Sequence, residues 1–79
     1  MQRDNEIDFL ECNKQGDAYY DQRNFSESLS CYEEALKFEN DRVVLTKKAL
    51  SLIRLGQLEE AFWIIDNIEI LVYIEKYTE

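Results

Sequence analysis

The side chains of this sequence that could carry out chemistry are mainly carboxylates and two cysteines. Adjacent acidic pairs stand at Glu33 and Glu34 and at Glu59 and Glu60, and paired carboxylates can serve in general acid–base catalysis. Neighbouring residues of a helix point in different directions, however, so each pair is expected to lie on a solvated surface. The sequence also lacks histidine, the side chain that most readily acts as a base near neutral pH. We therefore expect no enzymatic activity.

The cysteines, Cys12 and Cys31, belong to no CxxC motif, and without histidine they cannot form a standard zinc site. They could form a disulfide with each other, but two reduced thiols in a cytoplasmic protein are the interpretation that we favour. With only two glycines, the chain has no glycine-rich loop for binding phosphate. The sequence predicts no metal, no cofactor and a cytoplasmic location.

The charge excludes one class of partner. Seventeen acidic residues against nine basic ones give a net charge of −8, which repels the phosphate backbone of nucleic acids. The N-terminus has no apolar signal region, and the longest nearly uncharged apolar stretch, residues 70–74, is too short to span a bilayer. We therefore expect a single globular domain, residues 1–79, that binds neither nucleic acid nor membrane.

The spacing of apolar residues predicts an all-α protein. With no proline and two glycines, the chain has few of the residues that the turns of a sheet require. Apolar positions recur every three or four residues in four segments, 4–22, 26–38, 42–55 and 58–77. Their short connections favour antiparallel neighbours, so the four helices are expected to form two helical hairpins.

The two predicted hairpins resemble each other in sequence. A displacement of 33 residues aligns small residues with small residues, Gly16 with Ala49 and Ser28 with Ala61. The same displacement aligns large apolar residues, and it pairs Cys12 with Leu45, Tyr19 with Leu52, Phe25 with Leu58, and Tyr32 with Ile65. This agreement in both helices of both hairpins indicates an internal repeat.

The sequence GDAYYDQRNFSESLSCYEEAL, residues 16–36, resembles a tetratricopeptide repeat, a two-helix unit of about 34 residues with small and large residues at set positions. ALSLIRLGQLEEAFWIIDNIE, residues 49–69, is similar to a second copy. The resemblance implies two stacked antiparallel hairpins, as in an α-solenoid. We place the first repeat at about 9–41, the second at about 42–69 and a C-terminal extension or cap at 70–79. The turn between the repeats lacks the usual proline of the family.

The resemblance implies peptide or protein binding in a concave groove lined by the first helix of each repeat. Some members hold the acidic tail of a heat-shock chaperone with a lysine and an asparagine in the first repeat and an asparagine in the second. The matching positions here are Asn13, Asp17 and Lys47, and only Lys47 could neutralise a carboxylate. The groove is therefore expected to prefer a neutral or basic peptide. Its candidate contact residues are Asn13, Asp17, Tyr20, Asp21, Lys47 and Arg54.

The C-terminal segment, residues 61–77, carries apolar residues on more than one helix face. One interpretation is that residues 70–79 fold back as a short capping helix and complete a five-helix monomer. The interpretation that we favour is self-association, as in a homodimer, or contact with a partner protein. The candidate interface residues are Trp63, Ile70, Leu71, Tyr73, Ile74 and Tyr77.

The sequence as a whole predicts a non-catalytic protein–protein interaction module that presents a groove and an apolar C-terminal helix and associates with itself. One alternative is a monomeric adaptor, similar to a co-chaperone domain, that binds a protein tail in its groove. The other is a structural oligomerisation unit from a longer repeat array, with no ligand in the groove.

Overall fold

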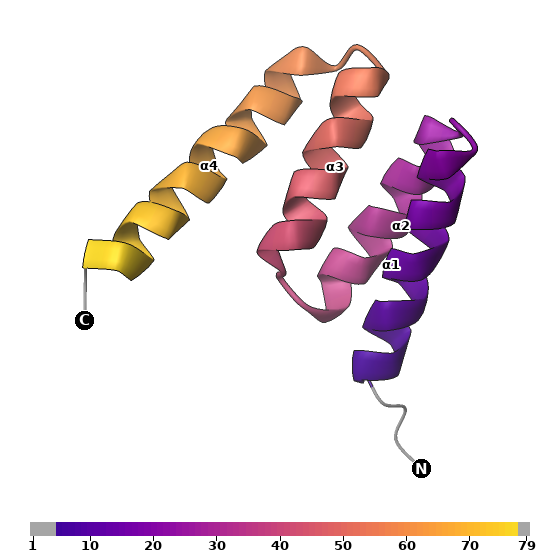
Figure 1. Ribbon diagram of the computed structural model, residues 1–79, viewed down its shortest axis with the longest axis horizontal. Coiled ribbons are helices and arrows are strands. Elements are labelled where there is room, and N and C mark those ends of the chain that lie inside the picture. The colour runs from indigo at the N-terminus through magenta and orange to yellow at the C-terminus, as the bar shows by residue number, and fades with distance from the viewer. Residues whose placement is uncertain (1–4, 78–79) are drawn as a thin grey trace.

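The computed structural model describes the backbone of residues 5–77 and the side chains of residues 6–69 and 76. The regular structure in this part of the chain is entirely α-helical, as predicted, and no strand occurs between residues 5 and 77. The four helices, shown in Figure 1, are α1 (Asn5–Asp21), α2 (Phe25–Phe38), α3 (Arg42–Arg54) and α4 (Leu58–Tyr77).

The helices form two hairpins that stack in chain order. Helices α1 and α2 pack against each other, as do α3 and α4, and the contact of α2 with α3 joins the two pairs. The result is a flat stack of 39 × 36 × 15 Å with α1 at one end and α4 at the other (Figure 1). Two stacked antiparallel hairpins are the predicted fold, which is thereby confirmed.

The first hairpin turns through a Schellman motif, in which the backbone just past a helix donates to carbonyls of its last turn. The Arg23 amide donates to the carbonyl of Tyr20 at 3.0 Å, and the Asn24 amide donates to that of Tyr19 at 2.9 Å. Arg23 adopts a φ of 65°, in the left-handed region that side chains other than glycine disfavour. The turn therefore holds its shape at some cost in backbone strain.

The second hairpin repeats this motif at the positions that the internal repeat aligns with the first turn. The Gly56 amide donates to the carbonyl of Ile53 at 3.0 Å, and the Gln57 amide donates to that of Leu52 at 2.9 Å. Here the left-handed position is occupied by Gly56, with a φ of 83°. The two hairpins therefore share their backbone geometry at the turn as well as their pattern of small and large residues.

The connection between the hairpins ends in a helix cap. Asp41 precedes α3 in an extended conformation, and its carboxylate accepts hydrogen bonds from the amides of Val43 at 2.8 Å and Val44 at 3.1 Å. These amides would otherwise lack partners inside the helix. Asp41 is therefore the N-cap of α3.

The core of the first hairpin is built around Tyr32. Its ring is buried together with Phe9, Ala35 and, from the second hairpin, Val44. The ring lies so close to Gly16 that a Cβ atom added there would be 2.5 Å from Tyr32 Cε1. The absence of a side chain at residue 16 is therefore what lets α1 and α2 approach each other around the tyrosine.

The core of the second hairpin is entirely aliphatic. Its fully buried residues come from α3 and α4 and are Ala49, Leu52, Ala61 and Ile64. Leu29 of α2 packs against this cluster, so the first hairpin contributes to the core of the second. Between the two cores, the buried hydroxyls of Ser28 and Ser51 share a hydrogen bond of 3.0 Å.

One sequence expectation needs correction. Helix α4 runs without a break from Leu58 to Tyr77, so residues 70–77 extend this helix and do not fold back as a separate cap.

Helix α1 buries Phe9, whereas its apolar residues Ile7 and Leu10 are exposed. It stands at the end of the stack, where α2 covers one side of it and α3 contacts only its C-terminal half.

Candidate functional site

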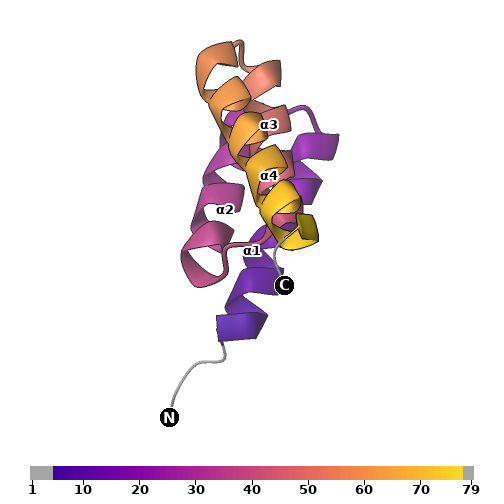
Figure 2. The same cartoon turned by 90° about the vertical axis from the view of Figure 1, so that its left-hand side faces the viewer.

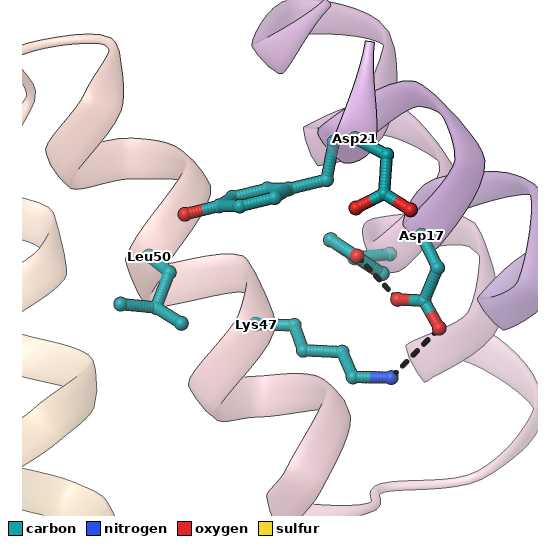
Figure 3. A pocket seen from close by; sticks show the side chains of 6 residues that line it. Asp17, Asp21, Lys47 and Leu50 are labelled. Atoms are coloured by element: carbon teal, nitrogen blue, oxygen red, sulfur yellow. Dashed lines mark hydrogen bonds and ion pairs between the residues drawn. The ribbon is translucent and has the colours of Figure 1, made fainter. Parts of the chain in front are cut away.

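A groove lies where the C-terminal half of α1 faces α3, with the Tyr32 side chain of α2 between them (Figure 3). Its volume is about 340 Å³. The side chains that line it are Asp17, Tyr20, Asp21, Tyr32, Lys47 and Leu50. The groove therefore combines carboxylates, an amine, two aromatic rings and one aliphatic side chain.

A polar network centred on Asp17 crosses the groove and joins the two hairpins. The Tyr32 hydroxyl donates to Asp17 Oδ1 at 2.6 Å, and Lys47 Nζ donates to Asp17 Oδ2 at 3.1 Å (Figure 3). The same amine donates to Asn13 Oδ1 at 3.2 Å. Both carboxylate oxygens and the lysine charge are thus engaged within the protein. A ligand carboxylate would have to compete with Asp17 for Lys47.

Tyr32 is held in its protonated form. Burial of the ring, and then its hydrogen bond to Asp17, raise the pKa of Tyr32 well above its usual value of 10.0. The hydroxyl therefore remains a donor to Asp17 throughout the neutral range and well into alkaline solution. In addition, Lys47 Nζ lies 5.9 Å from the centroid of the Tyr32 ring, within the range of a cation–π contact.

A second hollow of about 180 Å³ continues the groove toward the turn of the first hairpin. Arg54 Nε donates to the hydroxyl of Tyr20 at 3.2 Å, and the Arg54 guanidinium lies 5.8 Å from the Phe25 ring centroid. The Tyr20 and Phe25 rings meet edge to face with centroids 5.1 Å apart. Arg23 and Asp21 complete the lining, so this end of the groove carries two guanidinium groups beside one carboxylate.

The six groove residues proposed from the sequence lie close together in the structure. Asp17, Tyr20, Asp21 and Lys47 line the larger hollow, Asn13 binds Lys47, and Arg54 lines the smaller hollow. Sequence reasoning omitted Tyr32 and Leu50, which line the larger hollow, and Arg23 and Phe25, which line the smaller one. Tyr32 was assigned to the hairpin core alone, although its hydroxyl reaches the groove. Leu50 was not considered, although it is the counterpart of Asp17 in the second repeat, and this correspondence could have indicated it. That these residues bind a ligand stays a prediction.

Of the interface residues proposed from the sequence, the structure describes the side chain of Trp63, which is 66% exposed. It lies beside a hollow of about 230 Å³ between α3 and α4 that Leu45 and Ile64 also line. Two other apolar side chains of α4, Leu58 and Phe62, are exposed as well. The other five candidates, Ile70, Leu71, Tyr73, Ile74 and Tyr77, lie outside the described side chains.

The cysteines are free thiols and both are partly buried. Burial, and then the nearby Glu34, raise the pKa of Cys12. Burial, and then the neighbouring Cys12, raise the pKa of Cys31. Since the thiolate is the reactive form, both thiols are less nucleophilic than free cysteine at neutral pH. Within the described residues, histidine, cysteine and carboxylate side chains form no cluster that could hold a metal ion.

None of the helices formed by the described residues is both long and apolar enough to cross a bilayer.

Comparison with known proteins identifies the first hairpin. The search found no match among curated proteins and none among solved structures. Residues 9–42 match the tetratricopeptide repeat family, and this segment covers most of α1, all of α2 and the connection to α3. Tetratricopeptide repeats generally act as non-catalytic modules that bind other proteins. Residues 9–42 are therefore similar to one tetratricopeptide repeat, as the sequence predicted.

Proposed function

We propose that the chain is a non-catalytic protein–protein interaction module of the cytoplasm that associates with itself through α4. The observation that carries this proposal is the exposure of large apolar side chains along the first half of that helix. Trp63 is 66% exposed and Phe62 is 55% exposed. Monomeric proteins leave single apolar side chains in water, but a contiguous patch of them marks an interaction surface.

The energetics favour contact over a large part of the helix. Burying a large apolar side chain stabilises a complex by roughly 1.5–3 kcal/mol, whereas association itself costs on the order of 4–15 kcal/mol. Burial of Leu58, Phe62 and Trp63 together would contribute a free energy near the lower end of this cost. The apolar sequence of residues 70–77 continues the same helix and supplies further candidates for the contact.

Sedimentation equilibrium of the whole chain over a wide range of concentration tests this function. The chain has a mass of 9.5 kDa, so a species of about twice that mass at low micromolar concentration supports self-association. A change in Trp63 fluorescence on dilution would report the same equilibrium. A folded monomer at every concentration contradicts the proposal.

The groove supports a second candidate function, the binding of a neutral or basic peptide segment by a monomeric adaptor. Lys47 is already paired with Asp17, whereas Asp21 lines the groove without a salt-bridge partner among the described side chains. In the larger hollow, an acidic tail would therefore meet an engaged lysine and an unpaired carboxylate. The variant Asp21→Lys tests this function, because it changes the groove and leaves α4 intact. Weaker binding of an arginine-containing peptide in that variant, with an unchanged mass, would favour the adaptor.

A further inference from the structure

We infer that copies of this chain pair tail to tail, as a closed two-fold dimer, through the end of the stack formed by α3 and α4. This inference rests on the self-association proposed above and names its surface and symmetry. We call the surface the open face and define it by Leu50, Leu58 and Phe62, with Ile53 at its centre. Figure 2 views the stack from this end, with α4 nearest the viewer.

The open face follows from the contacts by which the first hairpin holds the second. Each contact joins a residue of α1 or α2 to a residue of α3. The pairs are Asp17 with Lys47, Tyr20 and Phe25 with Arg54, Ser28 with Ser51, and Glu33 with Lys48. Leu29 adds an apolar contact with the core of the second hairpin. These residues of the first hairpin together form the face on which the next hairpin sits.

The second hairpin presents the same face to solvent. In the alignment of the two repeats, Asp17 corresponds to Leu50, Phe25 to Leu58 and Leu29 to Phe62, which are 44%, 46% and 55% exposed. Tyr20 corresponds to Ile53, which is half-buried. The first hairpin uses the carboxylates of Asp17 and Glu33 and aromatic rings to hold its neighbour within the chain. The second has aliphatic and aromatic side chains at the matching positions, except that Asp66 corresponds to Glu33. The face therefore has the shape of an established interface and an apolar surface.

The other end of the stack does not complement this face. The α3 residues that contact the first hairpin are Lys47, Lys48, Ser51 and Arg54. Their counterparts on α1 in the repeat alignment are Lys14, Gln15, Ala18 and Asp21, all of them exposed. Stacking copies head to tail would press the open face of one copy against this polar surface. The polar groups would lose water without gaining hydrogen-bond partners.

The difference between the two ends decides the symmetry. A head-to-tail contact repeats without limit and produces filaments, whereas a two-fold contact uses the same surface of both copies and closes after two. Because the open face is apolar where the matching face of α1 presents Lys14, Gln15 and Asp21, the self-complementary pairing of two open faces is the arrangement that buries these apolar side chains on both sides. Each copy carries a net charge of −8, so their repulsion opposes pairing, and added salt should tighten the dimer.

Sedimentation equilibrium of three single variants beside the wild type tests this inference. Phe62→Glu and Leu50→Glu place a charge on the open face from α4 and from α3. Leu10→Glu is the matched control, because Leu10 is 54% exposed on α1, at the opposite end of the stack. Circular dichroism verifies that each variant keeps its helices. If Phe62→Glu fails to fold, the mass of Leu50→Glu alone tests the inference.

The inference predicts that the wild type and Leu10→Glu reach a limit of twice 9.5 kDa, whereas Phe62→Glu and Leu50→Glu remain at 9.5 kDa. A wild-type mass that continues to grow with concentration overturns the closed dimer. A fourth variant, Trp63→Glu, separates this inference from the proposed function. If both open-face variants stay dimeric while Trp63→Glu becomes monomeric, self-association through α4 stands and the open face is wrong. A monomeric wild type overturns the inference together with the proposed self-association.

Discussion

The two hairpins have the same backbone geometry at their turns and differ in the side chains that pack between their helices. Both turn through the same hydrogen-bonded motif, at Arg23 in the first and at Gly56 in the second. In the first, the closest approach of the helices pairs Gly16 with Tyr32, whereas at the matching positions the second has Ala49 and an isoleucine. The same hairpin is therefore compatible with a glycine and a tyrosine or with an alanine and an aliphatic residue.

This difference determines what each hairpin can do with its outer face. Tyr32 carries a hydroxyl to the surface of the core, where it binds Asp17, and Asp17 in turn binds Lys47 of the second hairpin. The first hairpin thus uses its outer face to hold a specific neighbour within the chain. The second has Leu50 and Ile65 at the corresponding positions, and Leu50 is exposed. Its outer face is suited to contact another protein.

The largest predicted effect is a loss of stability on truncating a core residue, and it differs between the two hairpins. Leu52 is fully buried, so Leu52→Ala should destabilise the protein by roughly 2–5 kcal/mol through lost apolar contacts and the cavity left behind. Its counterpart Tyr19 is only half-buried, so Tyr19→Ala should cost clearly less. Urea unfolding followed by circular dichroism measures both. Equal losses would contradict the view that Leu52 is more deeply packed in its core than Tyr19 is.

The next prediction tests the two pairs of residues that allow the helices of a hairpin to approach closely, glycine with tyrosine and alanine with isoleucine. Gly16→Ala forces a methyl group against the Tyr32 ring and should cost on the order of 1–3 kcal/mol in packing, partly offset by better helix propensity. Adding Tyr32→Ile reproduces the combination of the second hairpin and removes the clash. The double variant should therefore be more stable than the sum of the single changes by at least about 1 kcal/mol. Additive changes in the free energy of unfolding would show that the two positions are not coupled.

Exchanging the residues of the two hairpin turns is predicted to change the stability in opposite directions. Gly56→Arg places a side chain in the left-handed region and should cost about 1–2 kcal/mol. No other atom lies within 4 Å of where the Cβ would be, so the cost arises from the backbone alone. Arg23→Gly relieves the same strain in the first turn and should stabilise the protein by a smaller amount, because glycine also increases the entropy of the unfolded chain. Thermal unfolding measures both shifts, and a loss of stability in both variants would contradict this view of the turns.

The smallest predicted effect concerns the Tyr32 hydroxyl. Tyr32→Phe keeps the ring and removes the hydrogen bond to Asp17, which should cost about 1 kcal/mol because Asp17 is half-exposed. The pKa of Tyr32 is raised in the folded state, so its contribution is fully present below about pH 10, the ordinary value for tyrosine. Above that pH the unfolded chain ionises first and the wild type loses stability. Unfolding measured between pH 7 and pH 11 should show a shallower alkaline loss in Tyr32→Phe, and parallel curves would contradict the assignment.

The fold could be predicted because its signals are local and repeated. Apolar residues that recur every three or four positions indicated the four helices, and the matched small and large residues indicated two similar hairpins. The left-handed Arg23 could not be recognised in the same way, since an arginine carries no turn signal. Its alignment with Gly56 in the internal repeat was the available indication.

The site was harder to predict than the fold. Asp17 and Lys47 were placed in one groove by the resemblance to tetratricopeptide repeats, but their ion pair depends on how closely α1 approaches α3. That distance follows from packing across the two hairpins, which sequence periodicity does not determine. The side on which α1 is buried, at Phe9 and not at Leu10, depends on packing in the same way.

The most direct test of the contrast between the two ends of the stack is nuclear magnetic resonance of the 15N-labelled protein recorded over a dilution series. If the open face is where copies meet, the amide signals that shift with concentration will belong to α3 and α4 around Leu50, Ile53 and Phe62. The signals of Lys14 and Gln15 on the polar face of α1 will stay constant. Shifts concentrated on α1, or none at any concentration, would contradict the account.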